Sequence, residues 1–397
     1  MPYLGHHVLM WALGAATAAG AVAASAGEVP RYRVQDLGRL IATAGLNLYD
    51  SRLEDINNAG IVVGGGSGAS PLFMIEQGRL SLLPVDGFAS DGRATAINER
   101  GDILAWTLDN RGGGGYRDVV YRNGVATRHI TAPAGTGLGS VNAMNEAGQV
   151  IGRVMQVDSD GGAIGEWLPI INDAAGSRLI TIPNARAADA NAINDHGTVI
   201  GTADLNGRGS RVFVWRDGHS DVLPVPIGGG DSPNDYYYGQ DINNAGQMLV
   251  RHMTYGPGSG MTEFIYQDGH YTRLPLDSDQ RFDGGGGSDI NEHGWVVGQR
   301  TFETPDGTAP DRRAFLYRDS QLHDLDSLLR PQDSQRWQLS EAQALNDRGQ
   351  IIGIGYLNGQ LRQYLAAPVP EPSAGALLCA GLGLVLLAAR RGRSGRG

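Results

Sequence analysis

The chain has 397 residues, of which 60 are glycine, and only 19% are charged. Abundant glycine with few charges favours many short strands joined by turns, and 41% hydrophobic content is enough for a packed core. The net charge of −10 argues against a nucleic-acid partner, since such proteins carry a basic face. The sequence has no lysine, which excludes Schiff-base lysine chemistry, and its single cysteine, Cys379, excludes disulfides.

Residues 1–26 have the pattern of a secretory signal peptide. Val8 to Ala24 is an apolar stretch of small residues, and Ala24-Ser25-Ala26 fits the small-x-small cleavage pattern through Ala24 and Ala26. The segment before this stretch has two histidines but no arginine, so a buried N-terminal helix is the alternative. We expect an exported protein whose mature chain starts near Gly27.

One short pattern recurs seven times between the two ends of the chain. A small or acidic residue and an aliphatic residue precede Asn, and a polar residue, any residue and Gly follow it, before two further aliphatic residues. The asparagines lie 41, 47, 49, 49, 48 and 55 residues apart, at Asn57, Asn98, Asn145, Asn194, Asn243, Asn291 and Asn346. Four-stranded propeller blades have periods of about 40–50 residues. The spacing therefore predicts a seven-bladed β-propeller.

The Asn-x-x-Gly core of the pattern predicts a hairpin corner. An asparagine oxygen can accept backbone N–H groups, and glycine adopts positive φ without a Cβ clash. A calcium loop would need alternating carboxylates, which the pattern lacks, so we expect no metal site there. Each corner is followed by a strand with an aromatic residue, such as Val212 to Trp215, then by an Asp or Asn turn and a short strand. We expect these aromatic residues to pack between blades rather than to bind carbohydrate.

The segment Tyr32 to Gly38 has the pattern of a final blade strand with nothing before it. The seventh repeat ends at Gln363-Tyr364-Leu365 and lacks this strand. If the N-terminal strand completes the last blade, it removes two free sheet edges and closes the ring. An open β-solenoid or two smaller β domains are the alternatives.

The C-terminus has three parts in order. Val369-Pro370-Glu371-Pro372 comes first, the uncharged run Ala374 to Ala389 follows, and a cluster of arginines closes the chain. Arginines after an apolar run hold that end in the cytoplasm. This segment resembles the PEP-CTERM sorting signal of Gram-negative bacteria that make extracellular polysaccharide. The resemblance implies that Val369, Pro370, Glu371 and Pro372 are recognised by an exosortase, a membrane cysteine peptidase that cleaves near the motif. A plain C-terminal membrane anchor is the alternative.

The repeats themselves, over residues 31 to 367, resemble the HAF repeat of extracellular bacterial proteins. The Ala-Phe part of that motif is clearest at Ala314-Phe315, while its histidine is absent. This family transfers no catalytic residue to the chain. The predicted organisation is thus a signal peptide over 1–26, an all-β propeller over 27–367, and a sorting signal with a transmembrane helix over 368–397.

A search for catalytic chemistry finds no candidate. None of the histidines has metal-ligand spacing, and no nucleophile elbow or phosphate loop is present, so we expect no catalytic residue, metal or cofactor. The glycine runs 112–115 and 284–287 are predicted to be flexible loops. Two places could bind a ligand: a loop over 231–238 that contains Asp235, Tyr236, Tyr237 and Tyr238, and the corner aspartates Asp55, Asp241 and Asp289. Ordinary loop structure and local hydrogen bonding are the alternatives for these two places.

Two functions remain. The first is a non-catalytic module that binds or scaffolds, at the cell surface or in an exopolysaccharide matrix, with extracellular polysaccharide as a candidate partner. The second is a polysaccharide-active hydrolase or lyase, which would need two carboxylates facing each other across a closed pocket.

Overall fold

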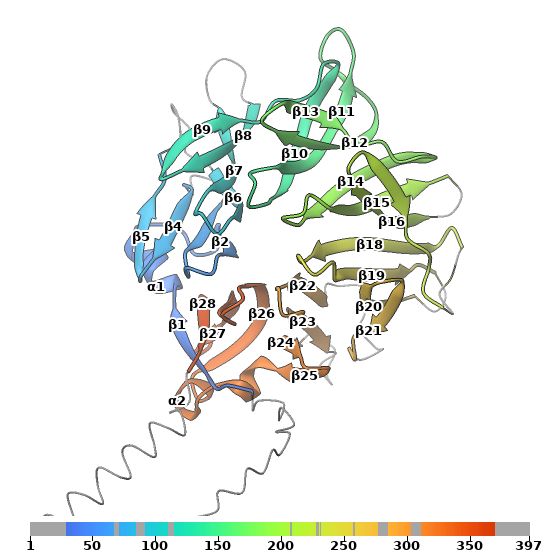
Figure 1. Ribbon diagram of the computed structural model, residues 1–397. Helices are drawn as coiled ribbons and strands as arrows, with labels where there is room; N and C mark the ends of the chain where they lie inside the picture. The colour runs from blue at the N-terminus through green and yellow to red at the C-terminus, as the bar shows by residue number, and fades with distance from the viewer. Residues whose placement is uncertain are drawn as a thin grey trace, which may run out of the picture.

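The computed structural model describes residues 29–66, 71–84, 92–109, 115–206, 209–227, 230, 232–256, 259–276, 285–302 and 311–369. These residues form antiparallel sheets set around a central axis, which is the arrangement of a β-propeller (Figure 1). Ala24, Ala26, Pro370, Glu371, Pro372 and the apolar tail lie outside the described residues. Within the described ranges, no helix has the length and apolar character needed to cross a membrane.

Before the last blade, the strands pair in chain order in runs of four; β2–β9 form one eight-stranded sheet, and β10 to β25 form four-stranded sheets. The runs are β2–β5 (Ser51–Ile56, Val62–Gly66, Phe73–Glu76, Arg79–Leu82), β6–β9 (Gly92–Ile97, Ile103–Asp109, Gly115–Arg122, Val125–His129), β10–β13 (Thr136–Met144, Val150–Val157, Ala163–Asp173, Gly176–Leu179), β14–β17 (Ala185–Ile193, Val199–Leu205, Ser210–Arg216, His219–Val222), β18–β21 (Asp235–Ile242, Met248–Thr254, Gly260–Gln267, His270–Arg273) and β22–β25 (Gly286–Ile290, Val296–Phe302, Asp311–Arg318, Gln321–Asp324). Each run is called a blade below and is named by its strands. A bridge between Gly66 and Gly92 also links β3 to β6.

The last blade contains both ends of the described chain. It pairs β26 (Trp337–Leu345), β27 (Ile351–Leu357), β28 (Gln360–Pro368) and β1 (Tyr32–Asp36) in that order. Tyr32 lies opposite Pro368 and Asp36 opposite Tyr364, so the predicted pairing of the N-terminal strand with the end of the last repeat is confirmed. The first strands of successive blades contact one another, and β26 contacts β2. The row of blades therefore closes on itself (Figure 1).

Three short helical segments accompany the last blade. Helix α1 (Gly38–Thr43) follows β1 and buries Ile41, while the 3₁₀ segment η1 (Leu325–Leu328) and α2 (Pro331–Ser334) connect β25 to β26. Ile41 joins Ile56, Phe73 and Ile352 in one apolar cluster between the last blade and β2–β5. Similar clusters of aliphatic and aromatic side chains lie between the other neighbouring blades.

The seven Asn-x-x-Gly segments form the predicted hairpin corners between the first and second strand of each blade. At the first corner Asn57 Oδ1 accepts the Ile61 N–H at 3.0 Å, and the Gly60 N–H donates to the Asn57 carbonyl at 2.9 Å. The glycine takes a φ of 81°, in the region where a side chain would be strained. The predicted Asp and Asn turns between third and fourth strands also form. Asp217 and Gly218, for example, have φ values of 50° and 87°, as a type I′ turn requires.

Each corner asparagine also bonds to the next blade, which the sequence did not reveal. Asn57 Nδ2 donates to the Asn98 carbonyl at 3.1 Å, and the same bond recurs from corner to corner. Asn346 Nδ2 then donates to the Asn57 carbonyl at 2.8 Å, across 289 positions of sequence. The corner asparagines are buried, so these bonds are shielded from water. We call this set the asparagine ring.

The asparagine ring generates a stability prediction. Asn145→Ala leaves the Gln149 N–H and the Asn194 carbonyl without their side-chain partners, and buried groups left unsatisfied in this way cost about 1–3 kcal/mol each. We expect this variant to lower the free energy of unfolding by about 2–4 kcal/mol in urea titrations. Asn234→Ala, at an exposed position, is the control and should change it by less than about 0.5 kcal/mol. Equal effects of the two variants would contradict a stabilising role for the ring.

Candidate functional site

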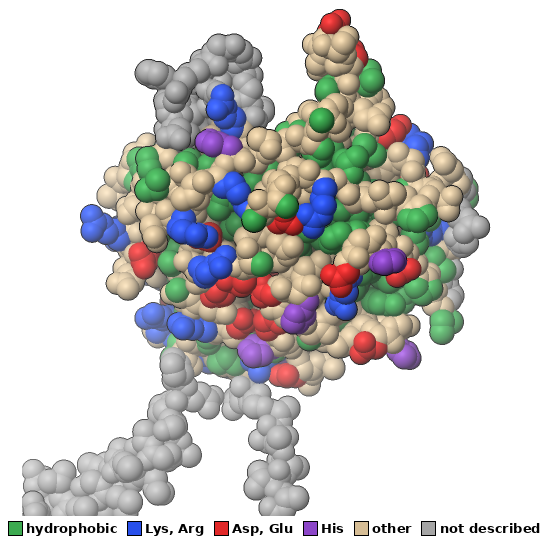
Figure 2. Space-filling view, turned by 45° about the horizontal axis from the view of Figure 1, so that its top comes forward, with side chains coloured by type: hydrophobic (Ala, Val, Ile, Leu, Met, Phe, Trp, Pro, Cys, Tyr) green, Lys and Arg blue, Asp and Glu red, His purple; other side chains and the backbone are tan. Residues whose placement is uncertain are grey.

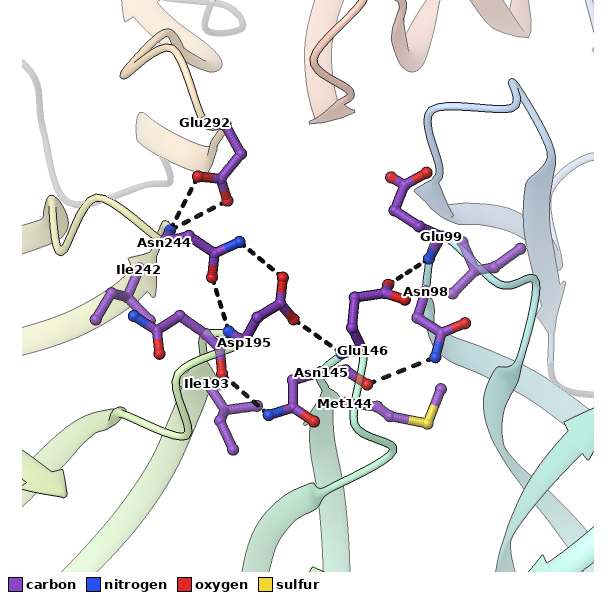
Figure 3. Close-up of a pocket in the computed structure, with 12 residues that line it drawn as sticks. Asn98, Glu99, Met144, Asn145, Glu146, Ile193, Asp195, Ile242, Asn244 and Glu292 are labelled. Atoms are coloured by element: carbon purple, nitrogen blue, oxygen red, sulfur yellow. Dashed lines mark hydrogen bonds between the residues drawn. The ribbon is translucent and has the colours of Figure 1, made fainter. Parts of the chain in front are cut away.

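A second ring of polar side chains surrounds the axis next to the asparagine ring. It consists of the residue after each corner asparagine, namely Asn58, Glu99, Glu146, Asp195, Asn244, Glu292 and Asp347. Each of these residues donates its backbone N–H to the side chain of its counterpart in the next blade. The Glu146 N–H, for instance, donates to Asp195 Oδ1 at 2.9 Å (Figure 3). We call this set the carboxylate ring. The polar character of this position in every repeat was its only signal in the sequence.

Five members of the carboxylate ring, Glu99, Glu146, Asp195, Asn244 and Glu292, line a small polar cavity of about 130 Å³ (Figure 3). Desolvation raises the pKa of Glu99, and the charges of Glu146 and Asp347 raise it further. Desolvation likewise raises the pKa of Glu292, with Asp347 and Asp195 adding to the effect. Two amides moderate this repulsion, since Asn58 Nδ2 donates to Asp347 Oδ2 and Asn244 Nδ2 to Asp195 Oδ2, both at 2.7 Å. The carboxylates are thus engaged in bonds between blades.

A β-bulge interrupts every first strand three residues before its corner asparagine. The extra residue is polar in each case: Glu54, Thr95, Asn142, Asn191, Gln240, Ser288 and Gln343. Asn142 Nδ2 donates to the Ala190 carbonyl and Asn191 Nδ2 to the Gly239 carbonyl, both at 2.7 Å and both in the next blade. A bulge leaves one residue outside the ladder, which frees its side chain for contacts across blades. Each first strand therefore has a polar side chain at this bulge.

The aspartates Asp55, Asp241 and Asp289 lie just after these bulges. Each accepts a backbone N–H from the following blade: Asp55 Oδ2 from Ile97 at 2.8 Å, Asp241 Oδ2 from Ile290 at 3.0 Å, and Asp289 Oδ2 from Leu345 at 2.7 Å. Hydrogen bonding near the corner, the alternative given by the sequence, is therefore what the structure shows, although these bonds join blades. Desolvation raises the pKa of Asp55 to about 6. Desolvation and the neighbouring Asp241 raise that of Asp289 well above its usual range.

The prediction of a loop over 231–238 is wrong for its second half, because residues Asp235–Tyr238 form the start of strand β18. Alternation along this strand buries Asp235 and Tyr237 and leaves Tyr236 and Tyr238 half-buried. The Tyr236 and Tyr238 rings are stacked with centroids 6.5 Å apart, and Tyr255 meets Tyr236 edge-on at 4.9 Å. Tyr255 is 46% exposed. The three rings form an aromatic patch at the end of blade β18–β21, which we call the tyrosine surface.

Polar contacts hold the tyrosine surface in place. His252 Nε2 lies 2.9 Å from Asp235 Oδ1, and the His252 ring stacks on Tyr237 with centroids 4.2 Å apart. Burial opposes ionisation of Asp235, but hydrogen bonds from His252 and Ser232 outweigh it and lower the pKa of this carboxyl. Burial and the hydrogen-bonded Tyr255 raise the pKa of Tyr238 to about 12. The phenol is therefore neutral at physiological pH.

A buried ion pair lies behind these tyrosines. Arg251 Nε is 2.5 Å from Glu263 Oε1, and Arg251 Nη2 donates to the Gly287 carbonyl at 3.1 Å. Burial raises the pKa of Glu263 to about 7, against the attraction of Arg251. The run 284–287, predicted to be a loop, is strand at Gly286 and Gly287, and Gly115 likewise begins β8. A Cβ at Gly286 would lie 2.4 Å from both Arg251 Nη2 and Glu263 Oε1, so glycine is needed for close packing of the blades.

Val369 is the one residue of the C-terminal motif that the structure describes. Its N–H donates to the Arg31 carbonyl at 2.7 Å, just beyond the pairing of Pro368 with Tyr32. The chain therefore leaves the last blade beside the point where the N-terminal strand enters it. On the face visible in Figure 2, acidic, arginine and histidine side chains are interspersed rather than segregated.

The raised pKa of Asp289 generates a pH prediction. The folded state holds this proton more tightly than the unfolded chain, so stability falls as pH rises from the unfolded value through the folded one. Asp289→Asn keeps an oxygen for the Leu345 N–H and removes the charge. We expect it to raise the melting temperature at pH 8 and to have little effect near pH 4.

Asp102→Asn is the opposite-sign control for this experiment. Hydrogen bonds from Arg122 lower the pKa of Asp102, so its contribution to stability is present at neutral pH and is lost as pH falls through the folded value. This variant should therefore be destabilised at pH 8. If the melting temperatures of the two variants changed with pH in the same direction relative to the parent, the raised pKa of Asp289 would be contradicted.

Comparisons with known proteins concern the fold. No family model matches the sequence, and no curated protein matches it. Among solved structures, an oligogalacturonate lyase from Vibrio parahaemolyticus is 12% identical, with a TM-score of 0.49 over 80% of this chain and 89% of that one. The β-propeller domain of the Trilobed protease from Pyrococcus furiosus is 10% identical, with a TM-score of 0.41 over 72% of this chain and 85% of that one.

The acylaminoacyl peptidase of Pyrococcus horikoshii is 10% identical, with a TM-score of 0.48 over 69% of this chain. The present chain spans only 44% of the length of that peptidase. All three TM-scores are below 0.5, so the assignment of a propeller rests on the strand pairing and blade contacts described above.

Proposed function

We propose that this chain is an exported, non-catalytic binding or scaffold protein that acts at the cell surface or in an exopolysaccharide matrix. The observation that carries the proposal is the bonding of the carboxylate ring. Its acidic side chains accept backbone N–H groups of the preceding blade, which is a structural use of carboxylates near the axis. A rigid ring with its axial acids engaged in this way is suited to presenting its surface to a partner.

The proposed scaffold is a seven-bladed propeller closed by the N-terminal strand. Seven corner asparagines bond in succession and return to the first, and β1 supplies the fourth strand of the blade β26–β28. Apolar clusters lie between neighbouring blades, including one that joins the last blade to β2–β5, and they also support a ring of seven blades.

The hydrolase or lyase alternative needs two carboxylates about 5–9.5 Å apart that face a substrate. Asp241 and Asp289 are neighbours at the axis, and hydrogen bonding between them contributes to the raised pKa of Asp289. Both, however, accept an N–H of the following blade through Oδ2. A carboxylate that is committed to the backbone in this way is poorly placed to act as nucleophile or general acid, so the geometry favours binding.

The tyrosine surface is the proposed contact for a saccharide ligand. Aromatic rings contribute apolar area with little loss of side-chain entropy, and phenol groups add hydrogen bonds at the rim. Tyr236, which is half-buried, and Tyr255, which is exposed, meet edge-on at the end of one blade. The notion of extracellular polysaccharide as partner rests on the PEP-CTERM resemblance of the C-terminus.

A glycan array with the purified protein tests this binding role. We expect Tyr236→Ala and Tyr255→Ala to weaken binding about two- to tenfold, as loss of an aromatic contact predicts. Tyr49→Ala is the matched control, since Tyr49 is 79% exposed and lies in the segment between α1 and β2. Release of shortened products from a bound polysaccharide would instead support the enzyme alternative.

The C-terminal motif is proposed as the substrate of an exosortase-type peptidase. Replacing Pro370, Glu371 and Pro372 by alanine should leave a full-length, membrane-associated precursor in cells that process the parent chain. Gel mobility and fractionation measure this outcome, and Ser394→Ala in the same tail is the control. Normal processing of the triple variant would contradict the sorting role.

A further inference from the structure

A separate cavity of about 430 Å³ opens on the last blade. Gln335, Arg336, Trp337 and Gln338 line it where β26 begins, and Tyr356, Asn358 and Gly359 line it from the end of β27 and the following turn. Its volume lies within the range of about 300–1,000 Å³ that is common for small-molecule sites. It is distinct from the carboxylate ring and from the tyrosine surface, since it shares no residue with either.

One of the side chains that line the cavity, Arg336, carries a positive charge. Among the described residues, none forms an ion pair or hydrogen bond with the Arg336 guanidinium. Two acids of nearby segments have other partners: Asp333 lies 2.9 Å from Arg330 Nε, and Asp311 lies 2.8 Å from Arg313 Nη2 and accepts a hydrogen bond from Gln338 Nε2 at 3.5 Å. In a chain of net charge −10, an exposed arginine at a cavity, with no acidic partner among the residues that the structure describes, favours an anionic ligand.

The remaining lining combines aromatic rings with carboxamides. Tyr356 is 42% exposed, while Trp337 is only 7% exposed and is held edge-on against Tyr364 with centroids 6.2 Å apart. Gln335, Gln338 and Asn358 are exposed amides, each able to donate and to accept. The wall is also fixed, because the Asn358 N–H donates to the Arg336 carbonyl at 2.8 Å and joins the two segments that form it.

We propose that this cavity is a second binding site, specific for an acidic saccharide of the uronate type. The guanidinium of Arg336 pairs with the sugar carboxylate, the ring of Tyr356 packs against the apolar face of the sugar, and the carboxamides bond its hydroxyls. An aliphatic carboxylate would use the arginine but leave the amides without partners, and a neutral sugar would leave the arginine unpaired. The inference names a site and a ligand charge that the proposed function does not require.

Isothermal titration of the whole protein with tetragalacturonate, and with neutral cellotetraose, tests the proposal. Arg336→Gln should weaken tetragalacturonate binding about tenfold to hundredfold, as expected for a hydrogen-bonded charge, and should not change the affinity for cellotetraose. Tyr356→Ala should weaken tetragalacturonate binding about two- to tenfold. The controls Arg79→Gln and Tyr49→Ala, at exposed positions on other elements, should bind as the parent does.

Two outcomes would overturn the site. One is unchanged tetragalacturonate binding by Arg336→Gln, and the other is an equal loss in Arg79→Gln, which would indicate non-specific attraction of charge. Tyr236→Ala separates this inference from the proposed function. If Tyr236→Ala weakens saccharide binding while Arg336→Gln has no effect, the tyrosine surface remains and the second site is wrong; the reverse result keeps the second site and removes the tyrosine surface.

Discussion

The structure depends on the hydrogen bond that each corner asparagine donates to the carbonyl of the next corner. A propeller blade is a small sheet that cannot bury its faces alone, so its stability comes from its neighbours. Apolar packing between sheets is strong but has little direction. The hydrogen bond from the asparagine side-chain amide to the carbonyl of the next corner is directional. It is also buried, where an unsatisfied polar group costs free energy. The ring of such bonds therefore fixes how each blade is set against the next.

One asparagine performs two tasks at each corner, which explains why this residue recurs. Its oxygen accepts the N–H four positions later and shapes the turn, while its amide nitrogen reaches the next blade. Aspartate could do the first task but cannot donate in its ionised form, and serine is too short to do both. One residue later, the carboxylate ring also joins each blade to the next, here through hydrogen bonds from backbone N–H groups to side-chain oxygens. Acidic side chains at the axis are thus part of the framework, in keeping with a binding or scaffold role.

Closure through the N-terminal strand also determines where the chain ends lie. Because β1 pairs with β28, the first described residues and Val369 are neighbours on the last blade. The tyrosine surface lies on blade β18–β21, and the cavity of Arg336 lies on the last blade itself. The two proposed contacts therefore lie on different blades.

The sequence alone determined the strands, the corners and the closing pair, because these follow from local rules: alternating side chains, the turn geometry of Asn and Gly, and a period close to that of one blade. It could not give contacts between residues far apart in the chain. The bond from Asn346 to Asn57 spans 289 positions, and the N–H that Asp289 accepts comes from Leu345 in the next blade. Asp235–Tyr238 were expected in a loop since their local composition is that of a turn, but pairing with β19 made them strand. The cavity at Arg336 likewise exists only because β26 and the turn after β27 fold against each other, and no local pattern records that contact.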